Sequence, residues 1–121
     1  MQLGDTIVSI ITGSTDGAVS VLRVSGPKAM AIVAAACNKN LALSKGYELY
    51  YVQFGKPKLI DQALLSVFKA PKSYTGEDVV EISLHASQYI VDAAVNELIA
   101  KGCRLAEAGE FTMRAYMNGK M

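Results

Sequence analysis

The sequence has no tryptophan, a single histidine and only two cysteines among its 121 residues. Cys37 and Cys103 lie far apart, and neither belongs to a Cys-x-x-Cys motif. His85 cannot complete a tetrahedral zinc site with them unless carboxylates contribute. This scarcity argues against a zinc site or a disulfide framework, and we expect two reduced thiols in the core of a cytoplasmic protein.

Neither sign of charge dominates, and no apolar run approaches the length of a membrane span. Twelve basic and eleven acidic residues leave a net charge of +1, whereas a protein that coats nucleic acid needs a clear positive excess. A local basic cluster is still compatible with this balance. The N-terminus lacks the basic region of a signal peptide, and the segment Asp5–Ile11 is too short for its apolar core. We therefore expect a cytoplasmic domain with no membrane association.

A nucleotide-binding loop is also missing. The sequence ends in Asn-Gly-Lys-Met, and Gly119-Lys120 is the pair that such a loop requires. A P-loop, however, follows a strand and reads G-x-x-x-x-G-K-[ST]. Here Arg114 stands at the first glycine position, and Met121 stands where serine or threonine belongs. We therefore predict that the chain hydrolyses neither GTP nor ATP.

The composition is typical of a folded protein, with 51% hydrophobic and 19% charged residues. The length suits a single domain, residues 1–121. Segments rich in β-branched and aromatic residues alternate with helical patterns. The expected strands are residues 6–11, 18–24, 47–55, 59–70 and 79–85, with a brief one at 103–106, and the expected helices are 25–38, 87–102 and 107–117. Because hairpins are mixed with helices, we predict an α+β fold with a mixed, mostly antiparallel sheet of about five strands and about three helices.

Helix ends are marked in the sequence. Ser25 or Gly26 is the expected N-cap of the first helix. In the last helix Glu110 and Arg114 form an i,i+4 pair of opposite charges. Gly119 then occupies the position expected of a left-handed helix cap.

Small and polar residues dominate the segment Thr12–Gly17, a predicted loop between the first two strands. Exposed backbone N–H groups in such a loop can hold an anion. A tight connection between two strands is an equally economical explanation, and the loop alone does not decide between them.

A few residues stand out as candidates for binding or catalysis. Glu81 lies mid-strand between apolar neighbours, where a carboxylate needs a partner; Arg23, Lys120 or a ligand could provide one. Arg23 ends a strand just before a helix, where it either pairs with a surface carboxylate or forms a fork for a ligand carboxylate. His85 is a candidate general base, but a single histidine at a strand end is more often structural. No serine or cysteine has a recognisable base and orienting group, so no catalytic triad is predicted.

Four motifs occur in order along the chain: DTIVSI, VLRVSGPKA, SYTGEDVVEI and AEAGEFTMRAYMNGKM. They resemble the N-terminal domain of the MnmE family of tRNA-modification GTPases, also called TrmE, and the resemblance extends over essentially the whole chain. In the family, a helical domain with an inserted GTPase domain follows, and this sequence contains neither. The resemblance therefore implies that the chain is the front part of a longer protein, with Lys120 as the last element of its site.

The resemblance implies a folate-binding and dimerisation module. In the family this domain forms a constitutive homodimer and binds 5-formyltetrahydrofolate, a tetrahydrofolate derivative taken to be the one-carbon source for a wobble-uridine modification of tRNA. An FAD-dependent partner of the MnmG type shares that reaction. The family's folate-contacting positions correspond to Arg23, Glu81 and Lys120, and no metal or nucleotide is implied here. The domain is then not expected to be catalytic by itself, whereas the longer protein would be a GTP-hydrolysing tRNA modification enzyme.

Two alternatives belong to other functional classes. A small folate-dependent enzyme related to the aminomethyltransferases would use a similar folate site, but no acid–base pair is recognisable beyond Glu81, and 121 residues is short for that class. A tRNA-binding module would need more positive charge and an aromatic-basic motif, and both are missing.

Overall fold

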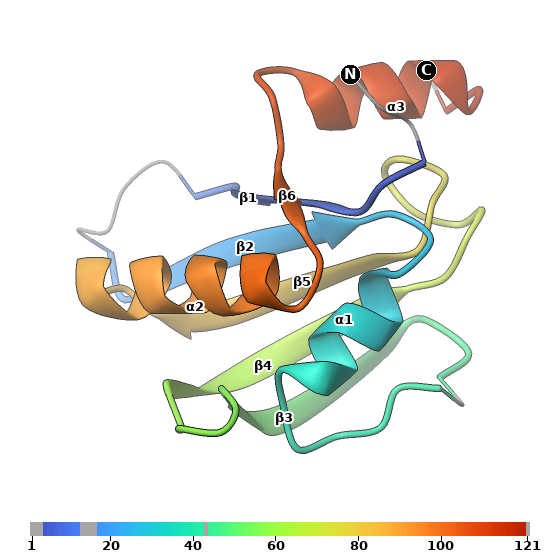
Figure 1. Ribbon diagram of the computed structural model, residues 1–121. Helices are drawn as coiled ribbons and strands as arrows, with labels where there is room; N and C mark the ends of the chain where they lie inside the picture. Colours follow the sequence, from blue (N-terminus) through green and yellow to red (C-terminus); the bar gives the residue numbers. More distant parts are fainter. Residues whose placement is uncertain (1–3, 13–16, 43, 121) are drawn as a thin grey trace.

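A computed structural model describes residues 4–12, 17–42 and 44–120 (Figure 1). Within them the chain forms six strands and three helices. The strands are β1 Ile7–Ile10, β2 Val19–Ser25, β3 Glu48–Phe54, β4 Asp61–Phe68, β5 Val79–His85 and β6 Arg104–Leu105. The helices are α1 Ala29–Ala35, α2 Gln88–Ala100 and α3 Glu110–Met117. The predicted α+β class and the predicted order of elements are confirmed.

All six strands join one sheet in the order β3-β4-β5-β2-β1-β6. Neighbouring strands are antiparallel except for β6, which runs parallel to β1. β3 and β4 form the predicted hairpin. The sheet is therefore mixed and mostly antiparallel, as expected, and the brief strand predicted at 103–106 is its sixth member.

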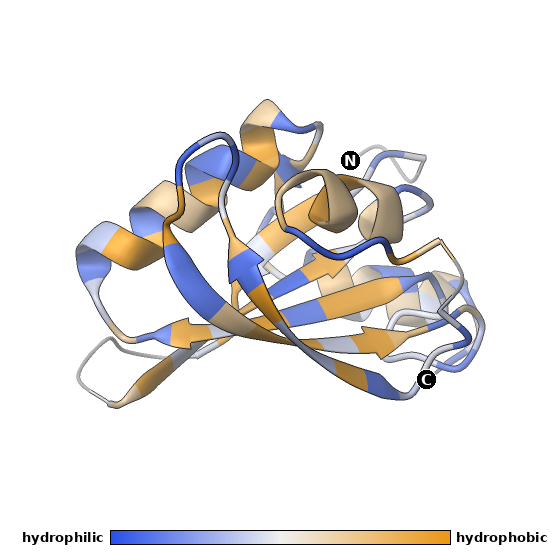
Figure 2. Cartoon of the chain, turned by 90° about the horizontal axis from the view of Figure 1, so that it is seen from below, coloured by the Kyte–Doolittle hydropathy of each residue, from blue (hydrophilic) through white to orange (hydrophobic). Residues whose placement is uncertain are grey.

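One face of the sheet carries the hydrophobic core. Alternate residues of β4 and β5 are apolar and buried on this face: Ala63, Leu65, Val67, Val80, Ile82 and Leu84. Figure 2 shows α1 and α2 on the same side of the twisted sheet, and Val33 of α1 and Leu98 of α2 are fully buried against it. The two-residue period of the strands thus separates a face covered by α1 and α2 from an opposite face that these two helices leave open.

The open face combines a polar row with exposed apolar side chains. The strand register aligns one residue from each of five strands across the sheet: Ser9, Arg23, Glu81, Ser66 and Leu49. In and beside this row, Leu49, Tyr51 and Leu64 are 66%, 71% and 40% exposed. Such exposure is unusual for large apolar residues that lie together on a sheet, and it marks the face as a candidate interaction surface.

The start of α1 differs from the prediction, because neither Ser25 nor Gly26 caps it. Ser25 is the last residue of β2, and its hydroxyl donates to the Glu77 carboxylate at 2.7 Å. The N-cap position belongs to Lys28, whose backbone N–H donates to the Thr6 hydroxyl at 3.0 Å. The helix is also shorter than predicted, with seven residues. A hydroxyl distant in sequence therefore replaces the local cap that the sequence suggested.

α3 begins at Glu110, three residues after the predicted start at Glu107. Gly109 precedes it with a left-handed φ of 73°, and the Glu107 backbone N–H donates to the Glu110 carboxylate at 2.9 Å. The predicted i,i+4 pair of Glu110 and Arg114 is confirmed at 3.1 Å. Gly119, with a φ of 74°, adopts the predicted left-handed conformation after the helix.

Three further predictions concern cysteines, membrane spans and the first loop. Cys37 and Cys103 are buried and unpaired, as predicted, and burial raises the pKa of the Cys103 thiol to about 12. Across the described ranges, every helix is too short or too polar to cross a membrane. Residues 13–16 of the predicted loop Thr12–Gly17 lie outside the described residues.

Candidate functional site

Arg23 and Glu81 meet in the middle of the open sheet face. β2 and β5 are antiparallel neighbours, and their register places the two residues opposite each other. Arg23 Nε donates to Glu81 Oε2 at 3.0 Å, and the side chains are 18% and 25% exposed. The structure thus brings together two of the three predicted site residues, and the mid-strand carboxylate has Arg23 as its partner.

The ion pair leaves part of its hydrogen-bonding capacity unused. Among the described residues, Arg23 donates only through Nε, and Glu81 accepts only through Oε2. A guanidinium has five N–H donors, and a carboxylate has about four acceptor sites. Two amino groups of Arg23 and one oxygen of Glu81 therefore stay available to a ligand.

Two aromatic rings flank the Arg23 guanidinium. Its central carbon lies 4.7 Å from the ring centroid of Tyr74 and 5.4 Å from that of Phe111. Cation–π contacts of this kind contribute about 0.5–1 kcal/mol at exposed sites. The Tyr74 hydroxyl also lies 3.2 Å from the Thr112 hydroxyl, which joins the loop 70–78 to α3. The two rings thus hold the guanidinium of Arg23 in place.

Lys120, the third predicted site residue, is exposed at the end of α3. Its side chain runs beside the loop 70–78, because a Cβ built on Gly76 would lie 3.4 Å from Lys120 Cγ. In the part of the chain that is described, no hydrogen bond or ion pair joins Lys120 to Arg23 or Glu81. The structure therefore brings Lys120 to the loop that borders the ion pair, but not to the pair itself.

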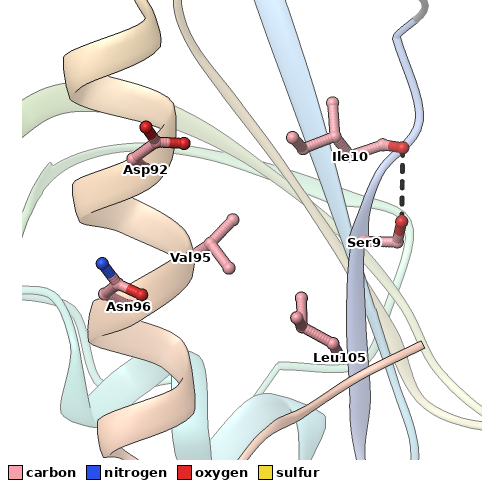
Figure 3. Close-up of a pocket in the computed structure, with 6 residues that line it drawn as sticks. All are labelled: Ser9, Ile10, Asp92, Val95, Asn96 and Leu105. Atoms are coloured by element: carbon pink, nitrogen blue, oxygen red, sulfur yellow. Dashed lines mark hydrogen bonds between the residues drawn. The ribbon is translucent and has the colours of Figure 1, made fainter.

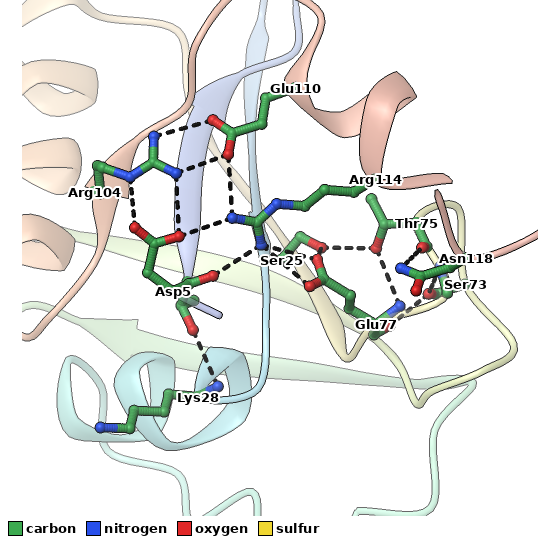
Figure 4. A network of polar contacts seen from close by, with 12 residues as sticks. Asp5, Ser25, Lys28, Ser73, Thr75, Glu77, Arg104, Glu110, Arg114 and Asn118 are labelled. Carbon is green, nitrogen blue, oxygen red and sulfur yellow. Dashed lines mark hydrogen bonds and ion pairs between the residues drawn. The ribbon is translucent and has the colours of Figure 1, made fainter. Parts of the chain in front are cut away.

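A buried ion-pair network joins the N-terminal segment, the loop 70–78 and α3 (Figure 4). Its charged members are Asp5, Glu77, Arg104, Glu110 and Arg114. Arg114, 1% exposed, donates to carboxylates on three segments, at 2.9 Å to Asp5, 3.1 Å to Glu77 and 3.1 Å to Glu110. Arg104 lies 2.6 Å from Asp5 and 2.7 Å from Glu110. Each arginine thus bridges at least two carboxylates.

The network keeps Asp5 and Glu110 ionised. Hydrogen bonds from Arg104 lower the pKa of Asp5 from 3.8 to about 2 and the pKa of Glu110 from 4.5 to about 2. The same hydrogen bonds raise the pKa of Arg104. Buried charges are tolerated when they are paired and hydrogen-bonded. The network therefore fixes the positions of the three segments that it joins.

Sequence reasoning found only one pair of this network. The i,i+4 spacing predicts the contact between Glu110 and Arg114, but such pairs usually lie on an exposed helix surface. Asp5 is 109 positions from Arg114, and Glu77 is 37 positions from it. No local pattern connects residues at these separations, so the sequence carries no signal for their contacts.

The sequence matches the family described as "GTP-binding protein TrmE N-terminus" over residues 6–120. The chain belongs to this TrmE family. The "tRNA modification GTPase MnmE" of Christiangramia forsetii is 50% identical over 127 residues, which cover 100% of this chain and 27% of the relative. Proteins of the same name from Flavobacterium johnsoniae and Legionella pneumophila are 45% and 44% identical, over 97% of this chain and 26% of each relative. The chain thus spans about a quarter of the length of these MnmE relatives.

The single histidine of this TrmE-family chain is paired with a carboxylate. His85 Nδ1 lies 3.0 Å from both carboxylate oxygens of Asp61, and the His85 backbone N–H donates to Asp61 Oδ2 at 2.9 Å. His85 lies four positions after Glu81 in β5, which corresponds to about 13 Å along a strand. His85 is therefore too far away to act on a group bound at Glu81, and its contacts favour the structural alternative.

A separate cleft of about 580 Å³ lies between α2 and the strands β1 and β6 (Figure 3). Among the described residues that line it, Asp92 is the only one with an ionisable side chain, and its other walls include Ile10, Val95 and Leu105. Among the described residues, no cluster of three histidine, cysteine or acidic side chains could hold a metal ion. The candidate site of this TrmE-family chain is therefore the open sheet face.

Proposed function

We propose that the open sheet face binds 5-formyltetrahydrofolate, with Arg23, Glu81 and Lys120 as contacts. The observation that carries this proposal is the incompletely used ion pair, in which Arg23 and Glu81 lie 3.0 Å apart and remain 18% and 25% exposed. A partly exposed pair of this kind contributes little to stability. Its central place on the face and its free donors and acceptor therefore favour a role toward a ligand.

The chemistry of a reduced folate fits these groups. A pterin presents an amino group and a ring N–H side by side, and a carboxylate such as Glu81 accepts from both. The glutamate tail of the folate is anionic, so it suits the amino groups of Arg23 or the ammonium of Lys120. Tyr74 and Phe111 add ring faces next to the carboxylate, against which a flat pterin can stack.

A homodimer would use the apolar part of the same face. Leu49 and Tyr51 lie on the edge strand β3, Leu64 lies on the adjacent β4, and all three are exposed. An isologous contact would cover these side chains on both copies at once. We therefore propose a homodimer through the β3–β4 side of the open face.

Within a longer protein, the domain would be the folate-binding module of an enzyme that modifies the wobble uridine of tRNA. The relatives carry the name tRNA modification GTPase, and this chain matches about a quarter of their length. GTP hydrolysis would belong to the remaining part. We propose a cytoplasmic location, with tRNA and an FAD-dependent subunit of the MnmG type as further partners.

Calorimetric titration of 5-formyltetrahydrofolate into the wild-type chain and Glu81→Ala tests the folate site. Losing a hydrogen bond to a charged group typically costs about 1.5–3 kcal/mol, so the affinity should fall roughly ten- to a hundredfold. The pair with Arg23 is partly exposed, so the free energy of unfolding should fall by about 1 kcal/mol or less. Lys120→Ala should weaken binding less, because this lysine is solvated.

Asp92→Ala is the matched control, since it also removes an exposed carboxylate, but from α2 on the covered side of the sheet. Its folate affinity should equal that of the wild type. Unchanged affinity in Glu81→Ala, together with a large loss of unfolding free energy, would assign Glu81 a purely structural role. A wild-type chain that takes up no folate would overturn the proposal as a whole.

A further inference from the structure

A pocket of about 420 Å³ lies at the C-terminal end of α1, beside the turn between β3 and β4. The described residues that line it include Cys37 and the polar side chains of Asn38, Lys39, Asn40 and Lys56, and none of these described residues is a carboxylate. Arg23 and Glu81 do not line it. The pocket is therefore separate from the proposed folate site and has a different chemistry.

The two asparagines turn their amide oxygens to the backbone. Asn38 Oδ1 accepts the Gln53 N–H at 2.9 Å, and Asn40 Oδ1 accepts the Ala42 N–H at 2.9 Å. Because a backbone N–H can only donate, these bonds identify the oxygen of each amide and leave its amino group as a donor. The lining therefore combines two amide donors with the ammonium groups of Lys39 and Lys56, and Lys39 Nζ also lies 4.8 Å from the ring centroid of Tyr50.

The surroundings of the pocket add positive charge. Lys58 belongs to the same turn as Lys56, and Lys101 Nζ donates to the Lys56 carbonyl at 3.3 Å. The carboxylate beside them, Glu97, is already bound by Lys101 Nζ and by the Lys56 N–H, each at 3.0 Å. The charge of the whole chain is only +1, but this end of the domain is locally basic.

The carbonyl groups at the end of α1 do not oppose an anion in this pocket. Free C-terminal carbonyls of a helix carry partial negative charge and would repel a phosphate. Here Val33 O and Ala34 O accept hydrogen bonds from the residues that follow the helix, and Ala36 O accepts the Gly55 N–H at 2.6 Å. These three carbonyl groups therefore oppose an anion less than free helix-terminal carbonyls would.

We infer that this pocket binds a backbone phosphate of RNA. Lysine, asparagine and backbone donors make most phosphate contacts in nucleic-acid complexes, and they act independently of base sequence. That the pocket binds an anion follows from its lining residues. That the anion belongs to RNA rests on the proposed function in a tRNA-modifying protein. The pocket would add one positioning contact to an RNA held mainly elsewhere.

Fluorescence anisotropy with a labelled, unmodified tRNA transcript tests this inference on the 121-residue chain. The variant Lys39→Gln/Lys56→Gln should reduce the slope of log K against log salt concentration by about one, because one phosphate contact is lost. Its dissociation constant should rise about tenfold near 0.1 M salt. Lys69→Gln/Lys72→Gln removes the same charge beyond the opposite end of β4 and is the matched control. This control should change the slope much less.

Asn40→Asp gives a second, sharper variant. Its carboxylate can still accept the Ala42 N–H, but it places a negative charge in the pocket instead of an amino group. RNA affinity should therefore fall at least as far as in the double lysine variant, and the melting temperature should stay the same. A normal RNA affinity in Asn40→Asp would contradict the inference.

Three other results would also overturn the inference. They are equal losses in the two double variants, no RNA binding by the wild type, and binding of inorganic phosphate but not of RNA. Folate titrations on the same variants keep the two proposals apart. Lys39→Gln/Lys56→Gln should bind 5-formyltetrahydrofolate normally, and Glu81→Ala should bind RNA normally. If one of the two proposals is wrong, these measurements still test the other.

Discussion

Replacing Arg114 with methionine should remove a large share of the stability of the domain. Arg114 is 1% exposed and is hydrogen-bonded to the carboxylates of Asp5, Glu77 and Glu110. Methionine can fill much of the same space, so the loss comes mainly from three carboxylates that lose one of their charged partners, of which Glu110 is fully buried. Removing one member of a buried ion pair typically costs about 3–5 kcal/mol. That is a large fraction of the roughly 5–15 kcal/mol that stabilises a folded domain.

The lower end of that range is the better expectation for this network. Arg104 still binds Asp5 and Glu110 when Arg114 is absent. Glu77 keeps the Ser25 hydroxyl at 2.7 Å, and its side chain is 15% exposed to water. Two of the three carboxylates thus retain an arginine, and we expect a loss of about 3 kcal/mol in the free energy of unfolding.

Urea unfolding followed by circular dichroism measures this loss. Lys101→Met is the matched control, because Lys101 and Glu97 also form an i,i+4 ion pair, at 3.0 Å, but with side chains 29% and 13% exposed. Its loss should be about 0.5 kcal/mol. An Arg114→Met loss as small as that of the control would refute the reasoning. The free-energy cost of removing the charges from water would then offset their mutual attraction, as it does in some buried ion pairs.

Three further results are expected. The folded-state pKa values of Asp5 and Glu110 are lowered to about 2, so their contribution to stability is present above pH 4.5 and lost as the pH falls toward 2. Urea unfolding at several pH values should therefore show that the free energy of unfolding of Glu110→Gln falls less steeply with decreasing pH than that of the wild type. Gly76→Ala should lower the melting temperature, because φ is +83° and the new Cβ would lie 2.8 Å from Asn118 Cβ. Sedimentation should show a dimer at tens of micromolar, roughly the range of weak association, and Leu64→Glu should give monomers; a monomeric wild type would contradict the proposed dimer.

The fold was predictable where the pattern of the sequence is local. Alternating apolar residues identified the strands, including β5 with its two distinct faces, and helical periodicity identified α2. The predicted range of α2 begins with Ser87. In the structure Ser87 is the N-cap of this helix and accepts the Ile90 N–H. The predicted helix boundary was wrong where a distant residue provides the hydrogen bond that a local cap was expected to provide. This is the case at α1, where the N–H of the preceding residue Lys28 donates to Thr6.

The candidate site was predictable only in part, for the same reason. A mid-strand carboxylate requires a partner, and the sequence offered Arg23 as one of several possible partners of Glu81. That the partner is Arg23 depends on β2 and β5 being neighbours in the sheet, and the chain order alone does not specify this. The contacts of Arg23 with Tyr74 and Phe111 depend in turn on where the loop 70–78 and α3 lie.

The buried network and the proposed site are coupled through the two segments that they share. Glu77 belongs to the same loop as Tyr74, and Arg114 lies about one turn along α3 from Phe111. The ion pair between Glu77 and Arg114 therefore sets the distance between the two rings that flank Arg23. If this coupling holds, Arg114→Met should weaken folate binding even under conditions where the variant is fully folded. Lys101→Met should not, because its ion pair touches neither segment.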